Sequence, residues 1–168
     1  MPLISEEYRE LNKLLHQSKP DYGTSGTSNA KYVVELANAI GSNDILDYGC
    51  GKGTLNECMN VEIKEYDPCI EGKGSPPLPA EIVVCTDVLE HVEPDCLDAV
   101  LDDLQKLTKR ALLLVVATRP AVKSLADGRN AHLIVEPIEY WLPRLMSRWE
   151  LIEFRSLEGE FKVVLYAR

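Results

Sequence analysis

The stretch DILDYGCGKG at residues 44–53 decides the fold, because a short apolar run passes directly into a glycine-rich turn. Residues 44–48 predict a strand, and Gly49, Gly51 and Gly53 follow it at alternate positions before a short expected helix. Glycine permits tight backbone turns and lets a ligand approach the chain closely. The strand, turn and helix therefore predict the first half of a βαβ unit with a ligand site at its turn.

Asp67 supplies the second sign of a nucleoside site. It follows the next expected strand, Val61–Tyr66, and lies 20 positions after Asp47. An acidic residue at about this distance is placed to accept hydrogen bonds from ribose hydroxyls. The turn lacks the Gly-Lys-Ser/Thr of a phosphate-binding loop, and its spacing departs from the G-x-G-x-x-G of dinucleotide-binding proteins. The pattern favours a nucleoside ligand without a pyrophosphate, although a purely structural turn would use the same glycines.

Apolar periodicity organises the rest of the chain into alternating helices and strands. Helices are expected over residues 6–17, 29–40, 97–107 and 138–148, and strands over residues 81–86, 111–117, 150–157 and 161–167. The second helix is expected to begin at the N-cap Ser28 and to end at Gly41. The first helix places four apolar residues on one face: Tyr8, Leu11, Leu14 and Leu15. This order predicts an α/β fold with a mostly parallel sheet, helices on both faces and a C-terminal antiparallel hairpin.

Length and composition narrow the class of protein. Residues 1–168 are expected to form one domain, with residues 1–28 as an N-terminal helix and lid loop and residues 29–168 as the core. No apolar run reaches the roughly 18 residues needed to span a membrane, and the N-terminus has no signal-peptide core. We therefore expect a cytoplasmic protein without a membrane partner. The net charge of −9 argues against a broad grip on nucleic acid, and the five cysteines, which form no CxxC pair, predict free thiols.

Three segments, taken together, resemble the class I S-adenosylmethionine (SAM)-dependent methyltransferases. ILDYGCGKG at residues 45–53 looks like their first motif, and EYDP at residues 65–68 resembles the end of their second strand. VCTDVLEHV at residues 84–92 resembles their fourth-strand motif, which commonly reads Val-Leu-Glu-His. The flanking YGTSG (22–26) and DGRNAH (127–132) resemble small methyltransferases of bacterial and phage genomes. The resemblance implies a Rossmann-like domain whose cofactor is SAM.

The same resemblance implies a cofactor site around the turn. Asp47 would orient the turn or reach the amino group of SAM, and Asp67 would hold the ribose. The other expected cofactor contacts are Gly49, Cys50, Gly51, Gly53, Pro68, Thr86, Asp87, Val88 and the lid residue Tyr22. Only residues 69–80 lie where the family usually has a full helix and a third strand. The fold is therefore expected to be shortened between the second and fourth strands, and the adenine contact stays unassigned.

Asp87, His91 and His132 are the candidate catalytic residues. Methyl transfer from a sulfonium is an in-line displacement in which alignment supplies much of the rate, and a hydroxyl or ammonium acceptor must also lose a proton. His91, together with Glu90, has a structural alternative, in which the pair orients the following loop. His132 has one as an exposed loop histidine. The remaining histidine, His16, is expected to be structural or solvated.

A metal site is a lower-ranked alternative. Asp87, Glu90, His91 and His132 resemble the Glu-x-x-Glu-His plus His site of small-RNA 2′-O-methyltransferases. Two oxygen and two nitrogen ligands would suit a divalent ion. However, Asp87 replaces the first Glu of that pattern, and the Leu-Glu-His triplet is common in relatives without a metal. The primary expectation is therefore a site without a metal.

These observations predict an enzyme that transfers a methyl group from SAM to an O or N atom of a small-molecule acceptor. Two alternatives stay open: an RNA or nucleotide-terminus methyltransferase with metal assistance, and a non-catalytic SAM-binding subunit. DNA is not an expected partner, because the segment that follows the expected strand at residues 81–86 reads Thr86-Asp87-Val88-Leu89 and has neither the Asp/Asn-Pro-Pro-Tyr/Phe nor the Pro-Cys motif of the DNA-modifying enzymes. The glycine spacing also speaks against a nicotinamide-dependent dehydrogenase.

Overall fold

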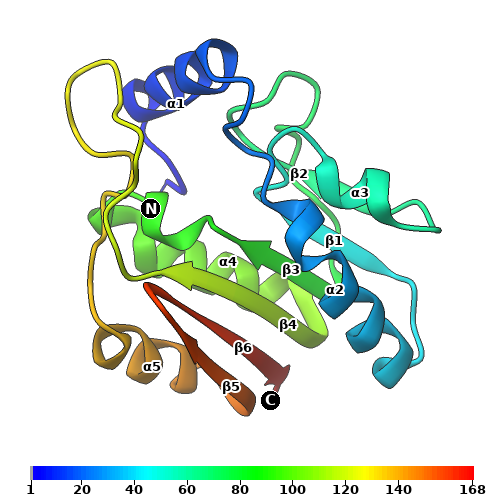
Figure 1. Ribbon diagram of the computed structural model, residues 1–168. Coiled ribbons are helices and arrows are strands. Elements are labelled where there is room, and N and C mark those ends of the chain that lie inside the picture. Colours follow the sequence, from blue (N-terminus) through cyan, green and yellow to red (C-terminus); the bar gives the residue numbers. More distant parts are fainter. Residues whose placement is uncertain (1) are drawn as a thin grey trace.

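A six-stranded sheet with the order β2-β1-β3-β4-β6-β5 forms the centre of the computed structural model, which describes residues 2–168 (Figure 1). The first four strands in the chain pair in parallel, and β6 pairs antiparallel with both β4 and β5. This topology confirms the mostly parallel α/β sheet with a C-terminal antiparallel hairpin. The strands are β1 (Ile45–Tyr48), β2 (Lys64–Tyr66), β3 (Ala80–Thr86), β4 (Thr108–Ala117), β5 (Trp149–Leu157) and β6 (Glu160–Ala167).

Helices cover both faces of the sheet. α2 (Gly26–Ile40) and α3 (Thr54–Cys58) pack on one face, whereas α4 (Leu97–Leu107) and α5 (Ile138–Met146) pack on the other. Neighbouring residues of β4 show why both faces are apolar. Leu113 packs in the core beside α2, whereas Leu112 and Leu114 pack in the core beside α4. A strand that is buried on both sides needs such an unbroken apolar run.

Several local expectations are wrong. α2 begins at Gly26 with Ser25 as its N-cap residue, so Ser28 lies inside the first turn and does not cap the helix. Leu14 is 51% exposed, because the buried face of the first helix runs through Tyr8, Asn12 and Leu15. β2 is shorter than expected, and α5 ends at Met146 rather than at residue 148. Before β2, the Ile63 N–H donates to Asn56 Oδ1 at 3.2 Å and so does not pair with a neighbouring strand.

The connection between β2 and β3 contains only turns, which confirms the expected shortening. Within residues 67–79 the Asp67 N–H donates to the Lys73 carbonyl at 3.0 Å, and the Lys73 N–H donates to the Ile70 carbonyl at 3.1 Å. The missing strand leaves β2 at one edge of the sheet. The wall beside Asp67 is therefore built from a compact turn segment and not from a further βα unit.

α1 (Glu6–Ser18) and the segment after β4 form a roof over the ends of the parallel strands (Figure 1). Tyr8 and Leu15 of α1 pack against Leu125 and Ala131 of that segment, in a small apolar cluster separate from the two sheet cores. Below the roof, two short 3-10 helices follow β3, at Leu89–His91 and Pro94–Cys96. Within residues 2–168, none of the helices has the length and apolar character needed to cross a bilayer.

Candidate functional site

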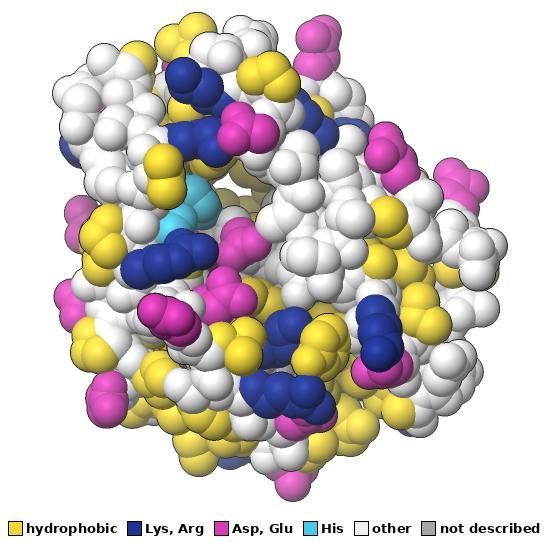
Figure 2. All heavy atoms as spheres, viewed as in Figure 1, with side chains coloured by type: hydrophobic (Ala, Val, Ile, Leu, Met, Phe, Trp, Pro, Cys, Tyr) yellow, Lys and Arg dark blue, Asp and Glu magenta, His cyan; other side chains and the backbone are white. Residues whose placement is uncertain are grey.

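A cleft of about 370 Å³ opens at the carboxyl ends of β1 and β3, beneath α1. The space-filling view shows the surface hollowed on this face, with both acidic and basic side chains around the mouth (Figure 2). In open α/β sheets, ligands bind in the crevice outside the carboxyl ends of the strands. The glycine turn, the end of β2 and the end of β3 all contribute to the lining, so the three motif segments converge on one cavity.

The glycine turn forms part of the cleft floor through contacts that only glycine permits. Gly49 and Gly51 have φ angles of 79° and 51°, in the left-handed region that L side chains rarely adopt. A Cβ on Gly51 would lie 2.6 Å from the carbonyl oxygen of Gly23, and one on Gly49 would lie 2.4 Å from Val88 Cγ2. The turn therefore packs directly against the loop that contains Gly23 and against Val88, which lies two residues after the end of β3.

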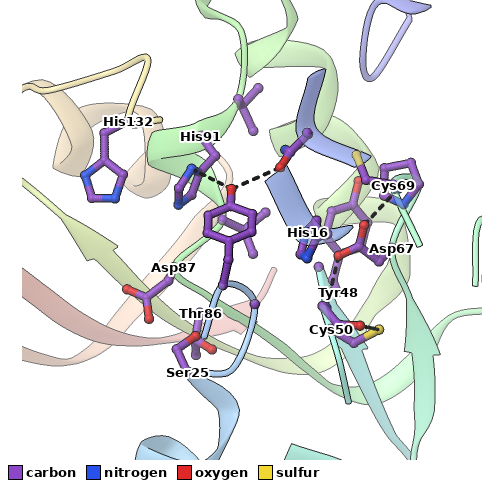
Figure 3. Close-up of a pocket in the computed structure, with 18 of the residues that line it drawn as sticks. His16, Ser25, Tyr48, Cys50, Asp67, Cys69, Thr86, Asp87, His91 and His132 are labelled. Carbon is purple, nitrogen blue, oxygen red and sulfur yellow. Dashed lines mark hydrogen bonds between the residues drawn. The ribbon is translucent and has the colours of Figure 1, made fainter. Parts of the chain in front are cut away.

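Asp67 faces this turn from the end of β2. Its Oδ2 accepts the Gly51 N–H at 3.0 Å, and its Oδ1 accepts the Cys69 N–H at 2.9 Å. The residue is only 7% exposed but lines the cleft, and each carboxylate oxygen keeps a lone pair beyond its backbone bond. Figure 3 shows Asp67 and Cys69 together at one end of the pocket. A carboxylate in this position could accept hydrogen bonds from the hydroxyls of a ligand bound in the cleft.

Asp47 provides a second carboxyl in the cleft, from within β1. The residue is 4% exposed, and its side chain accepts no hydrogen bond from the described residues. Burial raises the pKa of Asp47 to about 7, and the nearby Glu65 and Asp67 act in the same direction. A buried carboxyl without a partner at the edge of a cavity is suited to receive a cationic ligand group.

Asp87, His91 and His132 lie at the opposite end of the pocket from Asp67 (Figure 3). Asp87 has a φ of 55°, which is unusual for a residue other than glycine and is typical of strained positions at functional sites. His91 Nδ1 lies 2.8 Å from the Ala131 carbonyl oxygen, and His132 Nδ1 lies 2.6 Å from the Arg119 carbonyl oxygen. Because a carbonyl can only accept, both rings carry a proton on Nδ1.

The two histidines are neutral near pH 7. Burial lowers the pKa of His91 to about 3, and the neighbouring His132 acts in the same direction. Burial also lowers the pKa of His132. The rings meet edge to face with centroids 4.7 Å apart. With the proton on Nδ1, each neutral ring keeps an unprotonated Nε2 that can accept a proton or bind a metal.

Glu90 lies behind the cleft and does not line it. Its Oε1 accepts the Ala117 N–H at 3.0 Å, its Oε2 has no partner, and the residue is fully buried. Burial raises the pKa of Glu90 to about 8, and Asp87 acts in the same direction. Ligand atoms of Glu90, His91 and His132 lie within 4.8 Å of one another. The structure therefore groups three members of the expected metal set, and Asp87 is not part of that group.

Tyr22 contacts residues at both ends of the cleft. Its hydroxyl donates to Asn12 Oδ1 at 3.0 Å and lies 3.3 Å from His91 Nδ1. Its ring meets His16 on one side, with centroids 4.5 Å apart, and His91 on the other, with centroids 5.7 Å apart. Tyr22 thus lies between the Asp67 end and the histidine end of the cavity.

Most of the residues expected to bind the cofactor line this one cleft. Gly53 is the exception, because it caps α3 and a Cβ there would lie 2.5 Å from Glu65 Oε1. The expected residues that line the cleft are Tyr22, Asp47, Gly49, Cys50, Gly51, Asp67, Pro68, Thr86, Asp87 and Val88.

Sequence reasoning missed several other residues of the lining. Arg119 and Lys123 come from the segment after β4, and the roof helix contributes three polar side chains. The three residues of the roof helix could have been found from their spacing in the sequence, because Tyr8, Asn12 and His16 recur every four positions and so lie on one helical face. His16, which we expected to be structural or solvated, is one of the residues that line the cleft.

Comparisons with known proteins give one family match and several similar structures. A family described as a methyltransferase domain matches residues 23–161 of the chain. The DhpI–SAH complex is similar with a TM-score of 0.68 at 14% identity, over 97% of this chain and 98% of that chain. The Burkholderia thailandensis 1,6-didemethyltoxoflavin-N1-methyltransferase, with bound 1,6-didemethyltoxoflavin and S-adenosylhomocysteine, has a TM-score of 0.66 at 11% identity, over 99% and 92%.

N-methyltransferase NodS from Bradyrhizobium japonicum, in complex with S-adenosyl-L-homocysteine, has a TM-score of 0.56 at 13% identity, over 83% and 86%. A comparison with curated proteins finds no match. At these identities the structural likenesses show the fold, whereas the family match extends over most of the sequence. The chain therefore belongs to the methyltransferase domain family.

Proposed function

We propose that this protein transfers a methyl group from SAM to an O or N atom of a small-molecule acceptor. The observation that carries the proposal is the Asp67 carboxylate, which faces the glycine turn at the edge of an open cleft in a member of the methyltransferase domain family. The DhpI, toxoflavin-enzyme and NodS structures all hold S-adenosylhomocysteine, which supports SAM as the methyl donor. The toxoflavin enzyme is also named for a small-molecule substrate.

In the proposed complex the nucleoside lies at the Asp67 end of the cleft. Asp67 accepts hydrogen bonds from the ribose hydroxyls, and the methionine part lies over Gly49, Cys50 and Gly51. Asp47 receives the α-ammonium group, for which its unpaired carboxyl provides the opposite charge. Tyr22 and the end of β3, at Thr86, Asp87 and Val88, would then border the sulfonium, and the two histidines would border the acceptor.

The acceptor binds at the histidine end, where His132 serves as the general base. Its Nε2 carries no proton, since Nδ1 donates to the Arg119 carbonyl, and its lowered pKa keeps the ring neutral near pH 7. As the acceptor oxygen or nitrogen attacks the methyl carbon, the bond from that carbon to sulfur breaks, and the acceptor proton passes to His132. Asp87, which lines the same end of the cleft, binds the acceptor, and His91 positions the segment after β4 through the Ala131 carbonyl.

Titration calorimetry with S-adenosylhomocysteine, SAM and NAD tests the cofactor class. We expect both sulfur nucleosides to bind with micromolar dissociation constants and NAD to show no binding, since the turn has no pyrophosphate site. A screen of small alcohols, phenols, carboxylic acids and amines with isotopically labelled SAM then identifies the acceptor class. Binding of NAD in place of S-adenosylhomocysteine would overturn the proposal. Tight binding without transfer to any acceptor would support a non-catalytic SAM-binding subunit.

One observation favours a metal-assisted alternative that acts on RNA or a nucleotide terminus. Glu90, His91 and His132 offer converging ligand atoms, and the buried Glu90 Oε2 has no partner. These groups would hold a divalent ion, which could lower the pKa of a ribose hydroxyl.

Removal of divalent ions by a chelator distinguishes a general-base role of His132 from a metal-binding role. We expect methyl transfer to survive dialysis against EDTA, and His132→Gln to lower kcat by about 100-fold, because a lost general base typically costs 10²–10⁴ in rate. SAM affinity should be unchanged in this variant. Loss of transfer after EDTA treatment, with recovery on adding Mn²⁺ or Mg²⁺, would instead assign the histidines to a metal.

The remaining expectations are consistent with this proposal. Residues 1–28 act as helix and lid loop over a core of residues 29–168. We also propose that the enzyme is of the small bacterial or phage type, as the segments YGTSG (22–26) and DGRNAH (127–132) suggest. We further propose that it works in the cytoplasm, with neither DNA nor a membrane as partner.

A further inference from the structure

His16 is an unpaired imidazole in the cleft. Neither ring nitrogen hydrogen-bonds to another described residue, and Nδ1 is buried without a partner. The ring is held in place, because it meets Tyr22 edge to face and lies against Gly23, where a Cβ would come within 2.5 Å of His16 Cε1. Nδ1 lies against Gly23, where a Cβ would come within 2.9 Å of it, so it is shielded from the cleft. Nε2 also has no partner among the described residues and is not buried, so it is the nitrogen through which a ring that lines the cleft can contact a ligand.

The position of His16 relative to the glycine turn defines which part of a ligand it can reach. Gly23 touches both His16 and Gly51, and its carbonyl accepts the Lys52 N–H at 2.9 Å. His16 therefore lies directly across the lid loop from the turn, and Figure 3 shows it beside Asp67. In the proposed complex this is where the ribose meets the methionine part of SAM.

The charges of the methionine part require one more protein group. Asp47 matches the α-ammonium, but the α-carboxylate needs a cation or a strong donor. Arg119 pairs with Glu160 at 3.9 Å, and Lys123 pairs with Asp21 at 2.9 Å, so both basic residues of the cleft mouth already have acidic partners.

Lys52 also has partners already, since its ammonium donates to the carbonyls of Lys19 and Tyr22. In addition, Lys52 does not line the cleft. Among the described residues that line the cleft, His16 is the basic side chain next to the turn that has no polar partner.

We propose that His16 binds the α-carboxylate of SAM. This role rests on the proposed function of the same cleft and adds to it the residue that recognises the amino-acid end of the cofactor. His16 donates an N–H to the carboxylate from the roof while Asp47 receives the ammonium from the floor. The two groups together would distinguish SAM from nucleosides that lack an amino-acid tail.

Binding should also change the protonation of His16. Burial lowers the pKa of His16, Lys52 acts in the same direction, and Asp67 acts against both. The other ionisable groups that face the ring are Tyr22 and His91. The ring is therefore neutral near pH 7 before binding, and a ligand carboxylate raises its pKa. Binding of S-adenosylhomocysteine should then add part of a proton to His16. Calorimetry in two buffers of different ionisation enthalpy measures this uptake at pH 8, where Asp47, with its pKa of about 7, is already mostly ionised and releases little proton of its own.

The test pairs one protein change with one ligand change. The variant His16→Leu removes the donor and keeps a side chain of similar size against Tyr22. The ligand 5′-(3-aminopropylthio)-5′-deoxyadenosine is S-adenosylhomocysteine without its carboxylate. We expect His16→Leu to weaken S-adenosylhomocysteine about 10-fold to 100-fold, as for a charge-assisted hydrogen bond, and to leave the decarboxylated ligand within about twofold. Proton uptake should disappear with either change. Gln17→Ala, an exposed change on the same helical turn, serves as the control.

The outcomes separate this proposal from the function on which it rests. If the unchanged protein fails to bind S-adenosylhomocysteine, the proposed function itself fails. If the unchanged protein binds and His16→Leu binds equally well, only the role of His16 is overturned. Equal weakening of both ligands also overturns it, because His16 would then act on the nucleoside or on the roof. Circular dichroism and thermal unfolding show whether the variant keeps its fold.

Discussion

Asp67→Ala is expected to weaken S-adenosylhomocysteine binding by about 100-fold or more. Two ribose hydroxyls would lose a charged acceptor, and hydrogen bonds to charged groups contribute about 1.5–3 kcal/mol each. The variant also removes the acceptors of the Gly51 and Cys69 N–H groups, which are bonded at 3.0 and 2.9 Å. A donor left buried without a partner costs about 1–3 kcal/mol, so the unfolding temperature should fall by several degrees as well.

Two further variants separate binding from stability at Asp67. Asp67→Asn keeps an oxygen acceptor for one backbone N–H, so it should lose affinity with a smaller loss of stability. Asp44→Ala is the matched control, because Asp44 precedes β1 at the opposite end of the strand and pairs with Lys64 and Lys109 outside the cleft. It should lower stability and leave the dissociation constant unchanged. Full affinity in a folded Asp67→Ala protein would remove Asp67 from the ribose contact.

Asp47→Asn is expected to move stability and affinity in opposite directions. The folded-state pKa of Asp47 is raised to about 7 from an ordinary value of 3.8, so the folded ligand-free protein holds a proton that the unfolded chain releases. Stability therefore falls as pH rises from about 4 to 7, and the asparagine variant avoids this loss. At pH 8 we expect Asp47→Asn to be more stable than the unchanged protein by on the order of 2 kcal/mol.

Affinity should respond to pH through the same carboxyl. Asp47 must be ionised to receive the SAM ammonium, so the unchanged protein should bind S-adenosylhomocysteine more tightly at pH 8 than at pH 6. The loss caused by Asp47→Asn should be about 10-fold or more at pH 8 and much smaller at pH 6, where the unchanged residue is itself protonated. Thermal unfolding and calorimetry at the two pH values measure both effects. A loss of affinity that is equal at both pH values would show that the charge of Asp47 does not bind the ligand.

The fold was predictable because its signals are local. The apolar run of β4, the glycines after β1 and the alternation in the C-terminal hairpin each determine an element by pattern alone. The convergence of Asp67 and Gly51 was predictable as well, since the carboxyl ends of neighbouring parallel strands lie at the same edge of a sheet.

The roof was much less predictable, because tertiary contacts decide it. Leu14 fits the apolar stripe of α1 better than Asn12 does, but Asn12 is buried because Tyr22 donates a hydrogen bond to it from a separate loop. His16 lines the cleft only because Gly23 and Gly51 bring the lid loop against the turn. Nothing in the pattern of a single helix shows which neighbour will cover it, so the part of the cleft lining that α1 supplies was missed.

The shortening between β2 and β3 also affects how the sheet meets other molecules. Exposed strand edges invite pairing with other chains, and short or charged edges discourage it. Here one outer strand is only Lys64–Tyr66 and begins with a lysine and a glutamate. The other outer strand, β5, carries Glu153 and Arg155 and has a register irregularity between Leu151 and Glu153. The shortening has therefore left a three-residue charged strand at the β2 margin, which offers little backbone for edge-to-edge association. β5 is longer and exposes Ile152 and Phe154, so its charges and its irregular register are what oppose such pairing there.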